Sequence, residues 1–223
     1  MSNRSTEILE ELKSVVSGKT LDALIPPLIF VLTNSFLGLG PAIAIAMGTA
    51  LLFSLIRLIR RQPLKYALGG LGGVALASAF ALFAGRAENY FIPKILGSAF
   101  MVMLSLASQI AGKPLAAWAS HLSRAWPIEW YWRRDVRPAY REVTWLWTAL
   151  FVMRLAIQVL LYLRGSAAQL AWANLLLGTP VTLGVLVVSY LYGQKRLHQL
   201  GGPGIHEFTE GASPPWKGQT RGF

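Results

Sequence analysis

The sequence predicts an all-α protein of the polytopic membrane class, a bundle of six transmembrane helices, and three observations carry this prediction. Six apolar stretches approach the roughly 20 residues that a helix needs to cross about 30 Å of hydrocarbon. The composition is 54% hydrophobic and only 14% charged, with a mean hydropathy of +0.46. The loops between the stretches alternate between strongly basic and nearly uncharged.

The predicted spans form one transmembrane domain over residues 21–195. They lie near residues 21–38, 41–59, 67–85, 91–111, 143–163 and 168–193. Each must satisfy its backbone hydrogen bonds internally, and these continuous apolar runs lack the short alternating strands of a barrel. We therefore expect every span to be helical.

The two ends of the chain have patterns of their own. In residues 1–20, apolar positions from Ile8 to Val16 recur at helical spacing beneath acidic ones, which predicts a short amphipathic helix. It would lie on the membrane surface or dock against the protein's own loops. Residues 196–223 become rich in Gly and Pro after Leu200, which is typical of a disordered tail.

The placement of positive charge predicts orientation. Of the 21 Lys and Arg residues, seventeen fall in the N-terminal segment, the loops after the second and fourth spans, and the tail, whereas the opposite loops hold three. By the positive-inside rule both termini face the cytoplasm, and a bacterial inner membrane is the expected location. The net charge of +11 occurs in blocks beside apolar segments, which favours anionic headgroups over nucleic acid as the partner.

The cytoplasmic loop 112–142 interleaves aromatic residues with arginines, a composition suited to the headgroup layer or to a membrane-protein partner. The residues predicted to make this contact are Trp126, Trp130, Trp132, Arg133 and Arg134.

Small residues at four-residue spacing predict a helix-packing seam, because they let two backbones approach closely in lipid. In the third span they are Gly69, Gly73, Ala77, Ala81 and Gly85. The second span has the same pattern from Ala42 to Ser54. A sliding surface in a transporter is the alternative interpretation.

Arg154 lies about 16 Å into the fifth span, close to mid-membrane, where an unpartnered guanidinium costs on the order of 2.5–3.5 kcal/mol. Counting depth along the helices places Gln158, Asn34 and Asn174 near it, as a candidate polar pocket. Gly178 and Pro180 interrupt the sixth span nearby and free backbone carbonyl groups. Either a structural tie or a ligand pocket would explain the arginine.

The sequence lacks the residues that several kinds of site require. The chain has no cysteine, its three histidines show no ligand spacing, and no span carries a mid-membrane carboxylate. We therefore predict no metal, no cofactor and no catalytic residues. An enzyme acting on an anionic lipid through Arg154 is a further alternative.

Short clusters of residues within the spans resemble a known family. They are Asp22, Pro26 and Phe30; Arg57; Gly85, Arg86, Tyr90 and Phe91; Lys113, Pro114 and Leu115; Trp147, Arg154, Gln158 and Tyr162; and Gly178 with Pro180. Over roughly residues 20–195 this pattern resembles an uncharacterised bacterial membrane family, domain of unknown function family 3159. The Lys113–Leu115 cluster and the first span are also distantly similar to the intracellular septation protein A group, which is associated with cell-envelope synthesis. The first resemblance implies membrane location and no established activity.

We expect an envelope-associated or complex-forming membrane subunit that acts through its aromatic-basic loop. A small transporter for an anionic or polar solute is the alternative.

Overall fold

The computed structural model describes residues 19–61, 64–219 and 222–223, and throughout these ranges the secondary structure is helical. The amphipathic helix predicted for residues 1–20 lies outside the described residues except for Lys19 and Thr20, which begin the first described helix. The chain divides into unit 1, Met1–Gly97 with Leu155–Val181, and unit 2, Ser98–Arg154 with Thr182–Phe223.

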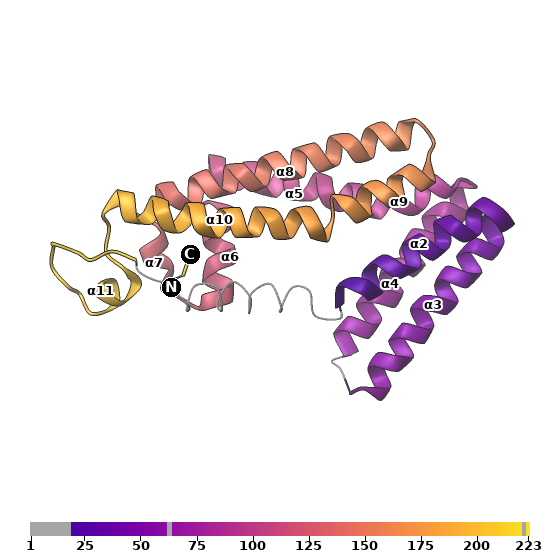
Figure 1. Ribbon diagram of the computed structural model, residues 1–223, viewed down its shortest axis with the longest axis horizontal. Helices are drawn as coiled ribbons and strands as arrows, with labels where there is room; N and C mark the ends of the chain where they lie inside the picture. Colours follow the sequence, from indigo (N-terminus) through magenta and orange to yellow (C-terminus); the bar gives the residue numbers. More distant parts are fainter. Residues whose placement is uncertain (1–18, 62–63, 220–221) are drawn as a thin grey trace. The chain divides into compact units, whose positions relative to one another are not determined.

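Unit 1 is built mainly from three consecutive helices (Figure 1). They are α2 (Lys19–Leu37), α3 (Leu39–Ile59) and α4 (Leu64–Ala84), joined by the 3-10 helix η1 (Ala87–Phe91) and the short α9 (Ala167–Leu176). Gly38 alone separates α2 from α3, with φ +81°, a conformation that glycine adopts without steric cost. The tight turn packs α2 against α3, and α4 returns along α3.

Unit 2 contains the remaining helices (Figure 1). They are most of α5 (Ile92–Ile110) and α8 (Arg137–Leu163), the greater part of α10 (Thr179–Leu200), and the short α6 (Leu115–Arg124), α7 (Ile128–Tyr131) and α11 (Ile205–Thr209). Ser105 of α5 hydrogen-bonds Thr148 of α8, and Glu142 of α8 pairs with Arg196 of α10 at 2.9 Å. These bonds hold the three long helices side by side.

Each predicted span falls on a helix or on a pair of consecutive helices. Among the described residues, four segments are long and apolar enough to cross a membrane: Leu39–Ile59, Ala87–Ile110, Arg137–Leu163 and Ala167–Leu200. At the first and third predicted spans the apolar helical segments are shorter, Ile25–Leu37 and Leu68–Ala84. The chain is thus an all-helical protein of multi-pass membrane type, and six crossings stay a prediction.

The last of these segments is not one continuous helix. Helix α9 ends at Leu176, and helix α10 begins at Thr179. A Cβ on Gly178 would lie 2.5 Å from the carbonyl oxygen of Asn174, so the chain passes too close for a side chain. The interruption expected at Gly178 and Pro180 is therefore present.

The core of unit 1 shows which part of the small-residue seam is internal. On α3 the whole stripe from Ala42 to Ser54 is buried. Of the predicted stripe in the third span, only Ala77 and Ala81 are buried, whereas Gly69, Gly73 and Gly85 are exposed, with open space where a Cβ would be. The structure shows no packing partner at these three glycines, so their part in a helix-packing seam stays a prediction.

Helical geometry explains this outcome. At 3.6 residues per turn, each step of four residues advances by about 40° around the axis, so a five-member stripe turns through about 160°. The buried face of α4 follows 3-4 spacing instead, through Val74, Ala77, Ser78 and Ala81. The α3 stripe stays buried because that helix packs against both α2 and α4.

Candidate functional site: the aromatic-basic cap

The aromatic-basic cap is the part of unit 2 formed by α6, α7, the first turn of α8 and the tail residues 201–219 and 222–223. Its centre consists of aromatic side chains that are wholly buried: Trp130, Tyr131 and Tyr140 each have 0% exposure. Successive rings touch edge to face, with centroids 5.1 Å apart for Trp130 and Tyr131 and 5.0 Å for Tyr131 and Tyr140. Such contacts add about 0.5–1.5 kcal/mol each beyond burial.

Short connections place these rings. Ala125 ends α6 in the left-handed conformation, φ +54°, and Pro127 precedes α7, so the chain reverses between two short helices. His121 hydrogen-bonds the carbonyl oxygen of Trp126 through Nδ1 at 2.6 Å, which fixes this reversal. The hydroxyl groups of Tyr131 and Ser120 lie 3.1 Å apart, and burial raises the pKa of Tyr131.

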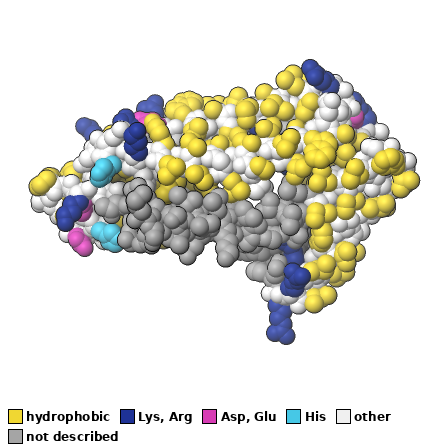
Figure 2. Space-filling model, in the orientation of Figure 1, with side chains coloured by type: hydrophobic (Ala, Val, Ile, Leu, Met, Phe, Trp, Pro, Cys, Tyr) yellow, Lys and Arg dark blue, Asp and Glu magenta, His cyan; other side chains and the backbone are white. Residues whose placement is uncertain are grey.

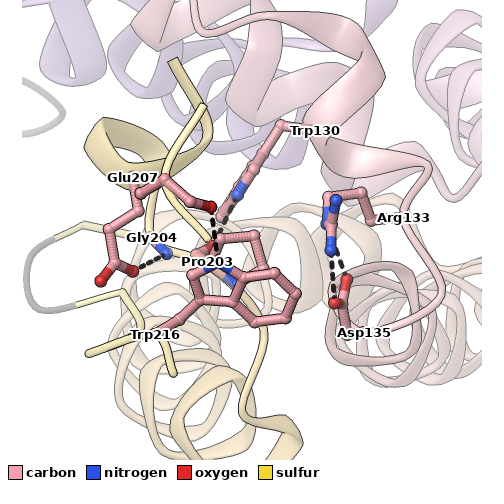
Figure 3. A network of polar contacts seen from close by, with 8 residues as sticks. Trp130, Arg133, Asp135, Pro203, Gly204, Glu207 and Trp216 are labelled. Atoms are coloured by element: carbon pink, nitrogen blue, oxygen red, sulfur yellow. Dashed lines mark hydrogen bonds and ion pairs between the residues drawn. The ribbon is translucent and has the colours of Figure 1, made fainter. Parts of the chain in front are cut away.

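The tail completes the cap, so the prediction of a disordered tail over residues 196–223 is wrong for the part that is described. Residues up to Leu200 continue α10, and Ile205–Thr209 form α11. Trp130 Nε1–H donates to the carbonyl oxygen of Pro203 at 2.9 Å, as Figure 3 shows. A buried indole N–H needs such a partner.

Glu207 organises the tail around one carboxylate. Its Oε2 accepts from the backbone N–H group of Gly204 at 2.8 Å (Figure 3). The same oxygen accepts from Gly218 N–H at 3.1 Å, and Oε1 accepts from Lys217 N–H at 2.7 Å. The bond from Gly204, followed by that from Lys217, lowers the pKa of Glu207. The side chain thus ties the start of α11 to a segment ten residues further along the chain.

Phe223 lies against the body of the cap. Its ring stacks on Tyr140 with centroids 4.3 Å apart, and its carbonyl oxygen accepts from Arg124 Nε at 3.2 Å. On α10, a Cβ at Gly193 would lie only 2.4 Å from the Phe223 ring. Gly193 therefore provides the space that this ring occupies.

Three of the five acidic side chains of unit 2, Asp135, Glu142 and Glu207, are engaged internally. Asp135 accepts two bonds from Arg133, at 2.9 and 2.7 Å, a bidentate pair (Figure 3). Glu142 accepts from Arg196 and Tyr192. Unit 2 has eleven Lys and Arg residues against five acids, so these pairings leave its surface with an excess of basic groups. In Figure 2, basic and His side chains gather at the end of unit 2 where α7 and α11 lie, and hydrophobic side chains cover its long helices.

The predicted contact residues of the loop separate into two groups. Trp130 is wholly buried, and Arg133 is half-buried against Asp135 and stacks over the Trp216 ring at 5.2 Å. For Trp130 the prediction of an interfacial contact is wrong, because the tail covers it. Trp126 and Trp132 are half-buried and Arg134 is exposed, so their contact role stays a prediction.

Three of the four residues of the predicted polar pocket form hydrogen bonds, in two separate places. Within unit 1, Gln158 Nε2 donates to Asn174 Oδ1 at 2.7 Å, and Asn174 Nδ2 donates to the carbonyl oxygen of Leu170 at 2.7 Å. Within unit 2, Arg154 Nη2 donates to Thr182 Oγ1 at 3.0 Å. Asn34, half-buried on α2, takes part in none of these bonds.

Sequence reasoning missed the residues that close the cap: Pro203, Glu207, Phe223 and Gln219, whose Oε1 accepts from Ile205 N–H at 2.8 Å. The available signal was Glu207 and the aromatic residues Phe208, Trp216 and Phe223 in an otherwise Gly- and Pro-rich segment. Residues of that kind are uncommon in disordered chains.

Comparison with known proteins identifies one family. Residues 16–199 match the family described as Protein of unknown function (DUF3159). No curated protein and no solved structure matches the chain. The predicted likeness to the septation protein A group stays a prediction.

Proposed function

Since this chain belongs to the DUF3159 family, we propose that it is a non-catalytic subunit of a membrane complex and that the cap binds a partner protein. One observation carries the proposal: a Gly- and Pro-rich tail is folded onto the loop by contacts that span up to 99 residues of sequence, between Arg124 and Phe223. Ordering such a segment costs roughly 1–2 kcal/mol per residue in backbone entropy. A role as a preformed binding surface would explain why the tail is ordered despite this cost.

The exposed face of α6 is the proposed contact. Trp118 and Leu122 lie one turn apart, with 39% and 79% exposure, while Ala117 and Ser120 of the same helix are buried. Aromatic and aliphatic groups on a rigid helix are the usual centres of protein interfaces. Inner-membrane location, cytoplasmic termini and six crossings are parts of the same proposal, supported by the charge asymmetry and the apolar helices.

Affinity purification of the full chain in mild detergent, followed by mass spectrometry, tests the proposal. Leu122→Asp places a charge in the proposed contact, and Ser213→Asp places the same charge on another exposed position of unit 2. We expect a stoichiometric partner with the wild type and with Ser213→Asp, and its loss with Leu122→Asp. Equal recovery with both variants would contradict the α6 contact.

A small transporter is the second candidate, because one buried polar atom suits it. Gln158 is 1% exposed, and its Oε1 has no hydrogen-bond partner among the residues that the structure describes. The mid-membrane Arg154 supports the same candidate through its charge. Reconstituted vesicles should then take up a polar anion, and Arg154→Gln should abolish uptake per folded molecule. Full uptake by that variant would leave Arg154 as a structural tie to Thr182.

A further inference from the structure

One exposed face of α8 changes from basic to apolar along its length. Arg137, Arg141 and Trp145 follow each other at four-residue spacing, and all three are exposed. The same face continues with the exposed Ala149 and Val152. At 1.5 Å per residue, Trp145 lies about 6 Å and Val152 about 16 Å beyond Arg141.

The end of α5 adds a third cation to this face. Gln109 Nε2 donates to the carbonyl oxygen of Arg141 at 2.9 Å, which holds the two helices together. Next to it the chain turns at Gly112, φ +65°, and a Cβ there would lie 3.8 Å from Nη1 of Arg137. The guanidinium group therefore lies over the turn, and the exposed Lys113 follows directly. We name Lys113, Arg137, Arg141 and Trp145 the basic corner.

The charges of the basic corner are not neutralised internally. Arg133 and Arg196 have carboxylate partners at 2.7 and 2.9 Å. Within the described part of the chain, none of the three cations of the corner has an ion pair. Three like charges held around one turn repel one another, and a bound anion would relieve this repulsion.

The surroundings indicate what kind of anion fits. Ile110, the last residue of α5, is 89% exposed and Trp145 is 48% exposed, on two helices that are apolar enough to cross a membrane. A soluble anion or an acidic peptide would leave these apolar groups in water. A phospholipid would cover them with its acyl chains, and tryptophan is enriched at this headgroup level.

From this arrangement we propose that the basic corner binds the phosphate group of an anionic phospholipid. Arg137 and Arg141 donate to the phosphate oxygens, Lys113 adds charge, and an acyl chain lies along Trp145, Ala149 and Val152. Planar guanidinium groups suit this role because they bind phosphate through paired, parallel hydrogen bonds. The site does not depend on the partner protein proposed above.

Native mass spectrometry of the purified full chain tests the site, with phosphatidylglycerol and phosphatidylcholine as probes at matched concentrations. The test variant is Arg137→Gln with Arg141→Gln. The matched control is Lys195→Gln with Lys217→Gln, which removes two exposed charges elsewhere in unit 2. A third variant, Arg137→Lys with Arg141→Lys, keeps the charge but removes the planar fork. Thermal unfolding in the same detergent verifies that each variant is folded.

The wild type should retain phosphatidylglycerol in preference to phosphatidylcholine. A basic residue near a charged bilayer contributes roughly fivefold in affinity, so the double Gln variant should lose about 30-fold. The control should lose less than threefold, and the Lys variant should lie between them. Equal losses in test and control would show attraction by net charge alone and overturn the site. If the double Gln variant kept its lipid binding but no longer retained a co-purified acidic protein, the corner would be assigned to a protein partner. That result would also overturn the proposal.

Discussion

Replacing Gly193 with alanine should release Phe223 from the cap while leaving α10 intact. The added Cβ would lie 2.4 Å from the Phe223 ring, closer than carbon atoms approach without displacement, so the ring must move. It would then lose its stacking on Tyr140, about 0.5–1.5 kcal/mol. It would also lose part of its burial, about 1 kcal/mol for half of a fully buried phenylalanine.

Together these losses predict a weaker docking of the tail by about 1.5–2.5 kcal/mol, which corresponds to a roughly 10- to 70-fold increase in the open population. The higher helix propensity of alanine, about 1 kcal/mol, does not offset this change, because α10 is helical whether the tail is docked or open. Global melting should therefore change little, and local opening should change strongly.

Amide hydrogen exchange followed by mass spectrometry measures that opening for residues 201–219. The matched control is Gly184→Ala in the same helix, where an added Cβ meets nothing within 4 Å. The control should leave exchange in the tail unchanged and stabilise α10 slightly. If Gly193→Ala and Gly184→Ala gave the same exchange in the tail, the inferred role of Phe223 would be refuted.

Three further predictions concern the core, the tail and the topology. Ala77→Leu should lower the free energy of unfolding in detergent by about 1–3 kcal/mol through overpacking. Gly73→Leu, on an open surface, should be nearly neutral in thermal melts. Equal losses of stability in the two variants would contradict the buried register of α4. Because the pKa of Glu207 is lowered in the folded tail, its contribution is fully present above the ordinary value near 4.5 and is lost as pH falls through the lowered value. Cleavage of the tail by an acid-active protease should accelerate over that window, and Glu207→Gln should remove the pH dependence; a dependence that persists would exclude this carboxylate as the cause. In a chain without cysteine, an impermeant thiol reagent applied to intact cells should label Glu88→Cys and spare Arg134→Cys, and the reverse pattern would invert the topology.

The helices could be predicted from sequence because hydropathy is a local property. A segment that cannot hydrogen-bond to lipid must form a helix, whatever its neighbours are. The interruption at Gly178 was predictable for the same reason, since Gly and Pro act on their own backbone. The buried face of α4 could not be predicted, because a stripe that faces lipid and a stripe that faces another helix are both apolar. Ala77 and Gly73 differ only in their position around the 3.6-residue turn of the helix.

The folded tail could not be predicted because its stabilising contacts are long-range. Trp130 and Pro203 are 73 residues apart in sequence, and composition carries no information about such a pair. Glycine is also ambiguous, since it marks flexible segments and close backbone approaches equally. At Gly204 a Cβ would lie 2.6 Å from the carbonyl oxygen of Gly218, so here glycine permits packing.

A local ion pair decides which arginines of the loop are available for binding. Arg133 and Arg134 are adjacent and equivalent in sequence, but the fold pairs Arg133 with Asp135 and leaves Arg134 exposed. An arginine already held by a bidentate carboxylate must break that pair before it can bind an external anion, and exposed arginines incur no such cost. The folded cap therefore moves the expected binding surface away from the centre of the loop. The expected binding surface lies instead at Arg137 and Arg141, which precede the apolar face of α8.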